Sequence, residues 1–279
     1  MYTLKCSNFH LDHTLDCGQV FRWNKVGGVW TGVVQGNVVR AWQDLHTGLV
    51  HIDSKLPEDF FRSYFRFDDE LDSILDEVNK DEHMDEAIRG YRGMRLIRQE
   101  PWECLISYLL ATAWNIPNIK NGISKLSRIF GEEIADGHYS FPGPGALATA
   151  CDTDLYSCKL GFRTDRIRKA AVQVADGDIS LDELFELDYE DAKKKLMELD
   201  GIGEKVADCI LLFAFGKMEA FPVDTHVEKV VSTYYGDHDF FKDGITKAKI
   251  GTWGRMYFGK YCGYAQQYLF YQKRLEGLK

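Results

Sequence analysis

Residues 189–217 read YEDAKKKLMELDGIGEKVADCILLFAFGK, a stretch in which two apolar helical patterns flank a glycine-containing turn. The apolar residues that recur at helical spacing are Ala192, Leu196, Leu199, Val206, Cys209 and Phe213. Glycine permits a positive φ and a close approach of two backbones, so Gly201 and Gly203 suit a tight turn between helices. The stretch therefore predicts a helical hairpin whose second helix begins at about Gly203.

The start of this second helix combines an anion-binding backbone with an amine. Free N–H groups at a helix N-terminus bind phosphate without side-chain charge, which makes Gly201 and Gly203 candidate phosphate contacts. Lys205 lies in the first turn, where the helix dipole disfavours a cation and so favours the neutral, nucleophilic amine. Cys209 lies one turn further on the same face. From these residues alone, a packing hairpin with a surface lysine and a buried cysteine is an open alternative.

The segment that follows the hairpin reads FPVDTH from Phe221 to His226. Pro222 ends the preceding segment, and Asp224 is placed to cap a helix that begins at Thr225. An aspartate near an amine nucleophile can also transfer protons. His226 lies in the first turn of that helix, where it can contact a phosphate. Taken alone, a capping aspartate is usually structural, and such a histidine is usually a surface residue.

The beginning of the chain differs from the rest, because it is rich in residues that favour strands. Residues 29–35 and 37–43 are two such runs split by Gly36, which predicts a hairpin of two strands. From Leu56 onward the apolar residues recur at helical spacing instead.

The predicted fold class is α+β. We expect a small N-terminal antiparallel β-sheet domain over residues 1–90 and an all-α helix-hairpin-helix body over residues 91–279. Asp68 or Asp69 is expected to cap an early helix. Pro101 suits the first turn of a long buried helix.

The composition excludes several classes of protein. The 279 residues include 45% hydrophobic and 28% charged residues, an ordinary globular mixture rather than a disordered one. The seven cysteines are odd in number and never spaced as CxxC, so neither a disulfide framework nor a four-thiolate zinc site is expected. Reduced thiols suggest a cytosolic compartment. The sequence predicts neither a signal peptide nor a membrane span, since it contains no apolar run of about 20 residues.

The net charge of −9 argues against a nucleic-acid partner, because DNA-binding proteins usually carry a basic face. In residues 201–279, however, Lys and Arg outnumber Asp and Glu by 11 to 9, so the acidic excess lies in the first 200 residues. The overall charge is therefore compatible with a local anion site near the hairpin.

The hairpin together with the PVDTH segment resembles the helix-hairpin-helix/GPD superfamily of DNA glycosylases, and in particular its 8-oxoguanine DNA glycosylase/AP lyase family. Further segments resemble that family in the same order: GQVFRW from Gly18, RQEPWEC from Arg98, LGFR from Leu160 and YAQQYLF from Tyr264. The hairpin alone is typical of the whole superfamily, whereas the complete set is specific.

This resemblance implies a bifunctional enzyme that flips out and excises 8-oxoguanine from double-stranded DNA by Schiff-base chemistry. Lys205 would attack the sugar C1′, and Asp224 would assist proton transfer. The residues implied to hold the damaged base are Gly18, Cys209, Gln266 and Phe270. Those implied to bind the DNA backbone are Gly201, Gly203 and His226. The Gly18 carbonyl would select the lesion, because 8-oxoguanine carries a hydrogen on N7 where guanine has a lone pair.

The resemblance also concerns cofactors. It implies a monovalent cation, such as potassium, on the backbone carbonyls of Met197, Leu199 and Ile202, where it would help to bind a phosphate. No other cofactor and no side-chain metal site are expected. The four-cysteine iron–sulfur cluster of endonuclease III-like relatives cannot be built, because only Cys262 follows Cys209.

Residues implied to contact DNA around the base opposite the lesion are Phe162, Arg163 and Asn115. Here the sequence departs from the family. Ala113 and Asn118 stand where the family has an asparagine and an arginine that contact the orphaned cytosine, and Phe162 replaces a tyrosine. Losing a bidentate donor removes about 1–3 kcal/mol of base discrimination. We therefore expect a relaxed dependence on the opposite base.

Two other functions remain as alternatives: a helix-hairpin-helix glycosylase for another damaged base, and a catalytically silent DNA-binding protein. Alkylation-repair relatives share the hairpin and the aspartate but lack the lysine, so Lys205 argues against them. We expect a monomer without membrane contact. It should be cytoplasmic or nucleoid-associated in a bacterium, nuclear in a eukaryote, and not secreted.

Overall fold

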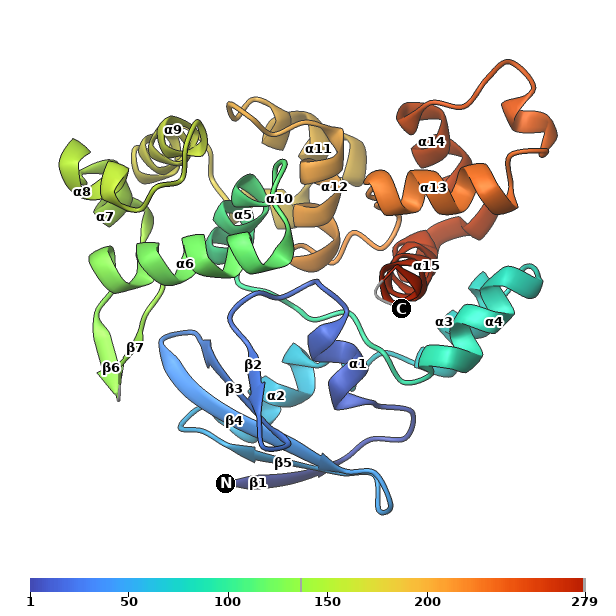
Figure 1. The fold of residues 1–279 in the computed structure, drawn as a ribbon, viewed down its shortest axis with the longest axis horizontal. Helices are drawn as coiled ribbons and strands as arrows, with labels where there is room; N and C mark the ends of the chain where they lie inside the picture. The colour runs from blue at the N-terminus through green and yellow to red at the C-terminus, as the bar shows by residue number, and fades with distance from the viewer. Residues whose placement is uncertain (136, 278–279) are drawn as a thin grey trace.

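The N-terminal part of the chain forms an antiparallel sheet (Figure 1). The computed structural model describes residues 1–135 and 137–277. The sheet has the order β1-β5-β4-β3-β2, and its strands are β1 (Tyr2–Lys5), β2 (Asn24–Val26), β3 (Val29–Val34), β4 (Asn37–Asp44) and β5 (Leu49–Asp53). Gln35 and Gly36, with φ of 44° and 69°, form the turn between β3 and β4. Two left-handed residues match the twist of paired strands, and the predicted hairpin is confirmed.

One face of this sheet is covered by α1 (Leu11–Asp16) and α2 (Glu58–Tyr64). Val39 and Ala41 on β4, like Val50 and Ile52 on β5, alternate along their strands and are fully buried. They share a hydrophobic core with Phe61 of α2. This alternation is expected where only one face of an antiparallel sheet is packed.

The rest of the chain is a helical body above the sheet in Figure 1. Its helices are α3 (Leu71–Val78), α4 (Glu82–Tyr91), α5 (Pro101–Leu110), α6 (Ile116–Phe130), α7 (Pro144–Ala148), α8 (Asp152–Ser157), α9 (Arg163–Ala175), α10 (Glu183–Glu186), α11 (Tyr189–Met197), α12 (Glu204–Phe213), α13 (Thr225–Tyr234), α14 (Lys247–Phe258) and α15 (Cys262–Glu276). Asp239–Phe241 and Gly259–Tyr261 are single 3-10 turns. The α+β fold class is confirmed.

One element departs from the predicted all-helical body. The strands β6 (Glu133–Ala135) and β7 (His138–Tyr139) form a short antiparallel ribbon between α6 and α7. The ribbon is largely outside the hydrophobic cores, and backbone pairing rather than an apolar pattern defines it. Periodicity in the sequence therefore gives no signal for it.

Two predicted helix starts have different outcomes. Pro101 occupies the first position of α5, as predicted. The predicted cap of α3 is wrong, because Glu70 is its N-cap and no side chain bonds to it. Asp68 and Asp69 instead bind the guanidinium of Arg98, at 2.7 and 3.3 Å. The bond from a carboxylate to a guanidinium is charged on both sides and is therefore stronger than a bond to a backbone N–H, so these carboxylates bind Arg98 instead of capping α3.

Two hydrophobic cores divide the described chain. Leu75 of α3 and Met84 of α4 belong to the helical core, because both helices pack against α15, as Figure 1 shows at the right. The cores do not divide at one point of the chain, because Cys17 and Phe21 belong to the helical core and Ile97 to the sheet core. The domain boundary expected at residue 90 stays a prediction.

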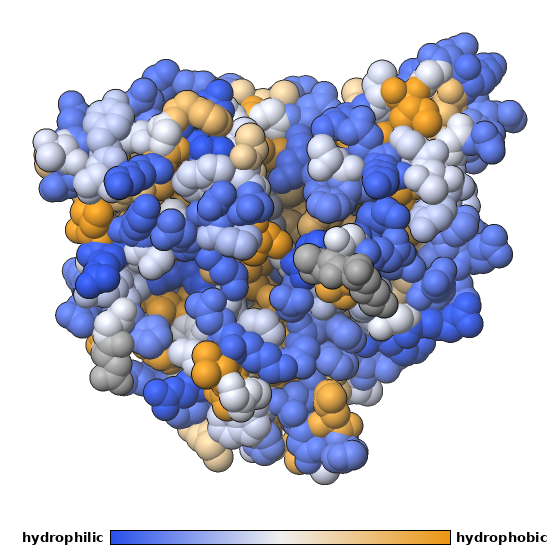
Figure 2. Space-filling model, viewed as in Figure 1, coloured by the Kyte–Doolittle hydropathy of each residue, from blue (hydrophilic) through white to orange (hydrophobic). Residues whose placement is uncertain are grey.

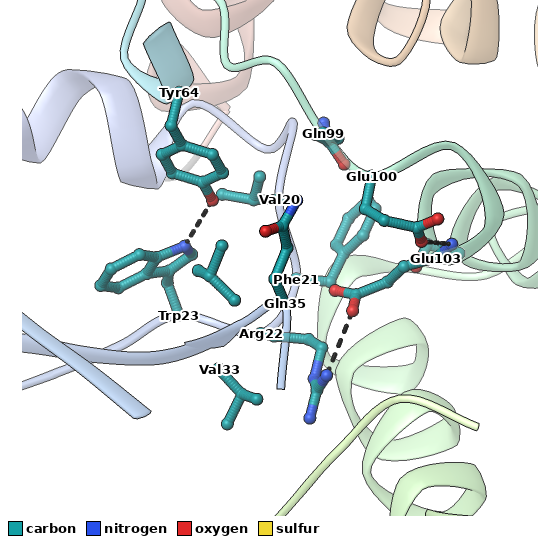
Figure 3. A pocket seen from close by; sticks show the side chains of 12 residues that line it. Val20, Phe21, Arg22, Trp23, Val33, Gln35, Tyr64, Gln99, Glu100 and Glu103 are labelled. Carbon is teal, nitrogen blue, oxygen red and sulfur yellow. Dashed lines mark hydrogen bonds and ion pairs between the residues drawn. The ribbon is translucent and has the colours of Figure 1, made fainter. Parts of the chain in front are cut away.

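The sheet and the helical body meet at residues 20–23, just after Gly18 (Figure 3). The Trp23 indole donates to the Tyr64 hydroxyl at 3.0 Å, and Arg22 pairs with Glu103 of α5 at 3.1 Å. These side chains border a small cavity of about 30 Å³, enough to hold water. The contacts hold the segment that follows Gly18 in place.

The molecular surface seen in Figure 2 is mostly hydrophilic, with hydrophobic residues in small separate patches. Across residues 1–135 and 137–277, no helix is long and apolar enough to span a bilayer. All seven cysteines are free thiols.

Candidate active site

The predicted helical hairpin is formed by α11 and α12, which pack against each other. Gly201 in the turn has φ of +87°, and a Cβ there would lie 2.4 Å from Cδ of Arg166 on α9, so the turn requires glycine. Gly203 is the N-cap of α12 and offers no side chain to the free N–H groups. A Cβ on Gly203 would meet no atom within 4 Å. The start of α12 is therefore open to an incoming anion.

Cationic side chains of α9 lie beside this turn. Nζ of Lys169 lies 2.7 Å and Nε of Arg166 lies 3.9 Å from the carboxylate of Asp200, which immediately precedes Gly201. The hairpin turn thus has positive charge at its side, which the segment 189–217 does not reveal.

Lys205 lies in the first turn of α12, where it is half-buried. Its Nζ lies 5.4 Å from the centre of the Tyr108 ring. Burial raises the pKa of the Cys209 thiol to about 11; the charge of Lys205 lowers it and that of Asp224 adds to the rise. A raised pKa keeps this thiol protonated near neutral pH, which argues against Cys209 as the nucleophile.

Asp224 is the N-cap of α13, and its Oδ1 accepts from the Val227 N–H at 2.8 Å. The predicted cap is confirmed. His226, one residue into α13, is exposed and meets the Phe270 ring edge-on with 5.7 Å between ring centres. α13 and α15 are thus joined through the His226 and Phe270 side chains.

The candidate base pocket brings together residues from the beginning and the end of the chain. A Cβ on Gly18, whose φ is +87°, would lie 3.3 Å from Cε1 of Phe270. Gln266 lies one turn before Phe270 on α15, so the two share a helix face. Gln266 is 4% exposed, and its Oε1 has no hydrogen-bond partner among the described residues. A buried acceptor without a partner is costly, and a bound ligand can satisfy it.

Arg163, implied by the resemblance to contact DNA, is buried in this structure. It is 4% exposed, and its guanidinium donates to the carbonyls of Thr112 and Leu160. The guanidinium lies 4.1 Å from the Trp114 ring centre and 4.4 Å from that of Phe162. In this structure the donors of Arg163 are thus engaged by backbone carbonyls, and two aromatic rings enclose its guanidinium. Phe162 itself is 53% exposed.

Asn115 also has a role within the fold. It is the N-cap of α6, and its Oδ1 accepts from the Asn118 N–H at 3.0 Å. Its carbonyl-type oxygen is therefore engaged, while its amide protons have no partner elsewhere in residues 1–135 and 137–277. Pro117, in the first turn of α6, is the sequence signal for this cap.

The three carbonyls expected to bind a cation lie at the end of α11 and in the turn. Leu199 O accepts from the Ile202 N–H at 3.1 Å, which leaves one lone pair. In the described chain, no backbone N–H outside the helices bonds to the carbonyls of Met197 or Ile202. Oxygen atoms free to accept at this turn fit a cation that prefers carbonyl ligands.

Sequence reasoning missed two residues of this region. Tyr108, which faces Lys205, belongs to an apolar helical stripe and therefore resembles ordinary core. Arg274 is the second, since a Cβ on Gly18 would lie 3.1 Å from its Nη1. Its position one turn after Phe270 on the same helix was a usable signal.

A helical hairpin with an open N-terminus, a lysine in its first turn and an aspartate capping the next helix defines the class of helix-hairpin-helix DNA glycosylases. Comparison with known proteins refines this class. A family model described as the N-terminal domain of 8-oxoguanine DNA glycosylase matches residues 1–105.

Solved structures extend the match over nearly the whole chain. MBOgg1 in complex with a low-affinity DNA ligand superposes with a TM-score of 0.91 at 32% identity, covering 99% of this chain and 96% of that one. The 8-oxoguanine glycosylase/lyase of Clostridium acetobutylicum, bound to double-stranded DNA with cytosine opposite 8-oxoguanine, gives 0.89 at 31% identity, covering 97% and 93%. N-glycosylase/DNA lyase OGG1 of Arabidopsis thaliana is 28% identical over 92% of this chain and 75% of its own length. The chain belongs to the 8-oxoguanine DNA glycosylase family.

Proposed function

We infer that this protein is a DNA glycosylase with AP lyase activity that excises 8-oxoguanine from double-stranded DNA. The observation that carries this inference is the position of Lys205 in the first turn of α12, beside the Tyr108 ring and next to the open N-terminus at Gly203. The relatives named N-glycosylase/DNA lyase and 8-oxoguanine glycosylase/lyase support the same conclusion. We propose that the protein acts as a monomer.

The chemistry begins with the Lys205 amine. Its lone pair attacks C1′ of the extruded nucleotide, the bond from C1′ to the base breaks, and the base leaves with the bonding electrons and takes up a proton. Ring opening of the sugar gives a Schiff base between Nζ and C1′. Loss of a C2′ proton then expels the 3′ phosphate by β-elimination, which nicks the strand. Asp224, at the start of α13, would stabilise the cationic sugar and move protons.

The pocket supplies base recognition. Gly18 offers a carbonyl that accepts no hydrogen bond from the described residues, as an acceptor for N7–H requires. The unpartnered Oε1 of Gln266 is suited to N–H groups on the pairing edge of the base. Phe270 and the neutral Cys209 thiol would cover its two faces.

DNA binding would centre on the hairpin. The N–H groups at Gly201 and Gly203 would hold a phosphate, with a monovalent cation on the carbonyls of Met197, Leu199 and Ile202 adding positive charge. His226 on α13 is exposed and can contact the neighbouring phosphate. No other cofactor is part of this proposal.

Relaxed recognition of the opposite base is part of the proposal. The family's cytosine-reading arginine is Asn118 here, and Arg163 is stacked between Trp114 and Phe162 with its donors on protein carbonyls. Reading a cytosine would require these contacts to break. The half-exposed Phe162 would serve as the wedge that fills the emptied stack.

Borohydride trapping tests the proposed function. Wild-type protein and an 8-oxoguanine duplex should give a covalent protein–DNA adduct on reduction, and Lys205→Gln should give none. Lys194→Gln, which changes an exposed lysine of the same hairpin, serves as the control and should still be trapped. Trapping that survives Lys205→Gln would reject this nucleophile, and no trapping by the wild type would favour a monofunctional enzyme or a silent binder.

A further inference from the structure

The segment around Gly18 is held by side chains at every carbonyl but one. Arg274 Nη2 donates to the Asp16 carbonyl and lies 2.9 Å from the Asp16 carboxylate. Gln267 Nε2 donates to the Cys17 carbonyl at 2.8 Å. The Gln19 carbonyl accepts from Gln99 and Tyr108, at 2.8 and 3.1 Å. In the described chain only the Gly18 carbonyl of this run accepts nothing.

This pattern determines how freely the Gly18 carbonyl can turn. A peptide plane rotates about the bonds on its two sides, and glycine allows rotations that a Cβ would block. The plane before Gly18 is fixed through the Cys17 carbonyl by Gln267. The plane after Gln19 is fixed through the Gln19 carbonyl by Gln99 and Tyr108. The plane that carries the Gly18 carbonyl lies between these two and is thereby restricted.

Two side chains of α15, Gln267 and Arg274, bind carbonyls of this segment, and the Gln267 contact is the more buried of the two. Gln267 is 3% exposed and reaches Cys17 from α15, the helix that also carries Gln266 and Phe270. The helix α15 therefore carries two residues of the candidate base pocket and also binds the segment around Gly18 that lies opposite them. A shift of α15 would move both sides together.

We propose that Gln267 is a positioning residue for lesion discrimination, which acts by fixing the Cys17–Gly18 peptide so that the Gly18 carbonyl stays directed at N7 of the base. Arg274 performs the same task one residue earlier, through the carbonyl of Asp16. This inference rests on the proposed function. The ligand that it concerns is a purine whose N7 carries a hydrogen, in contrast to one whose N7 carries a lone pair.

The test measures discrimination rather than stability. Duplexes with one 8-oxoguanine·C pair and matched duplexes with guanine·C are bound to protein carrying Lys205→Gln, so that no DNA is cut. Adding Gln267→Met keeps the side-chain length and removes the donor. The Kd ratio, defined as the Kd for the guanine duplex divided by the Kd for the 8-oxoguanine duplex, measures discrimination. It should fall by about tenfold, the change expected from losing about one hydrogen bond.

Tyr268→Phe is the matched control on the same helix. It also removes one buried donor to a backbone carbonyl, that of Met94 at 2.9 Å, but that carbonyl is remote from Gly18 in the chain. Both variants should lower the melting temperature, whereas only Gln267→Met should lower the Kd ratio. An unchanged ratio in Gln267→Met, or an equal fall in Tyr268→Phe, would overturn the proposal.

Arg274→Gln keeps the proposal testable if Gln267→Met does not fold. The Arg274 side chain is partly exposed, so its replacement should be tolerated by the fold. Losing its bond to the Asp16 carbonyl should reduce the Kd ratio severalfold. An unchanged ratio in a folded Arg274→Gln protein would also count against the proposal. If the wild type is trapped on 8-oxoguanine but Gln267→Met keeps full discrimination, only the positioning role fails; if the wild type is not trapped, the proposed function itself fails.

Discussion

Lys193 and Asp208 form a buried ion pair between the two helices of the hairpin, with Nζ 3.0 Å from Oδ1 and side chains 9% and 5% exposed. The Tyr189 hydroxyl donates to the same Oδ1 at 2.6 Å and accepts from Arg255 of α14 at 3.1 Å. Burial raises the pKa of Asp208, and the Lys193 charge opposes this rise. The pair fixes α12 against α11, and it thereby fixes Lys205 at the start of α12.

Replacing one partner of this pair should destabilise the fold strongly. Lys193→Met leaves the Asp208 carboxylate buried without its cation, and we expect a loss of about 3–5 kcal/mol in the free energy of unfolding, measured in urea. Lys194→Met is the matched control, because Lys194 pairs with Asp191 at 2.9 Å on the open surface and should change stability little. Equal losses in the two variants would contradict the buried role.

Acid should destabilise the protein through His13. Burial, followed by the charge of His10, lowers the pKa of His13 from 6.5 to about 4. The unfolded chain therefore binds this proton at a higher pH than the folded chain, and the contribution to stability present above pH 6.5 is lost as the pH falls toward 4. His13→Phe keeps a ring against Tyr91 and Tyr271 and should lose less stability between pH 7 and pH 5 in urea unfolding. A pH dependence as steep as that of the wild type would exclude His13 as the group responsible.

Gly18→Ala should remove excision. Its φ of +87° strains any L side chain, and the new Cβ would lie 3.3 Å from Phe270 and 3.1 Å from Arg274. Gly28→Ala is the control, because Gly28 has φ of +83° with no atom within 4 Å of a Cβ. Both variants carry similar backbone strain, so single-turnover cleavage should be lost only in the first. Cleavage by Gly18→Ala at the wild-type rate would remove Gly18 from the pocket.

The opposite base should have little effect on excision by the wild type. Rates on 8-oxoguanine paired with C, A, G and T are expected to differ by less than about fivefold, the lower end of what about 1–3 kcal/mol of bidentate recognition gives. Trp114→Ala opens one side of the stack around Arg163 and should increase the preference for C. Trp42→Ala, which disrupts a stack with His51 on the sheet, should not. A strong preference for C in the wild type would refute the relaxed recognition.

Salt should weaken DNA binding only moderately. The hairpin offers backbone N–H groups, and the nearby Lys169 and Arg166 share Asp200. The slope of log affinity against log salt should be shallower than the value near −9 expected for about ten phosphate contacts. A slope that steep would place the binding surface elsewhere on the protein.

Elements set by local sequence were predicted best. The β3–β4 turn, the Pro101 helix start, the hairpin and the Asp224 cap each depend on residues within a few positions of one another. Contacts between residues far apart in the chain could not be predicted from local sequence patterns. Asp68 and Asp69 pair with Arg98 rather than capping a helix.

The opposite-base region shows the same limit. The sequence marks Arg163 as cationic, but not that Trp114 and Phe162 enclose it, because no local pattern determines a stack among three side chains. The unpartnered oxygen of Gln266 likewise becomes visible only once its surroundings are known.

The hydrogen bond from Gln267 to Cys17 joins residues 250 positions apart. During synthesis, the hairpin that carries Lys205 leaves the ribosome before α15 does. The chain thus acquires its amine before the contact that orients the Gly18 carbonyl can form. Under the role proposed for Gln267, choice among bases is completed only when α15 docks, the same step that buries Tyr264 and Tyr268 in the helical core.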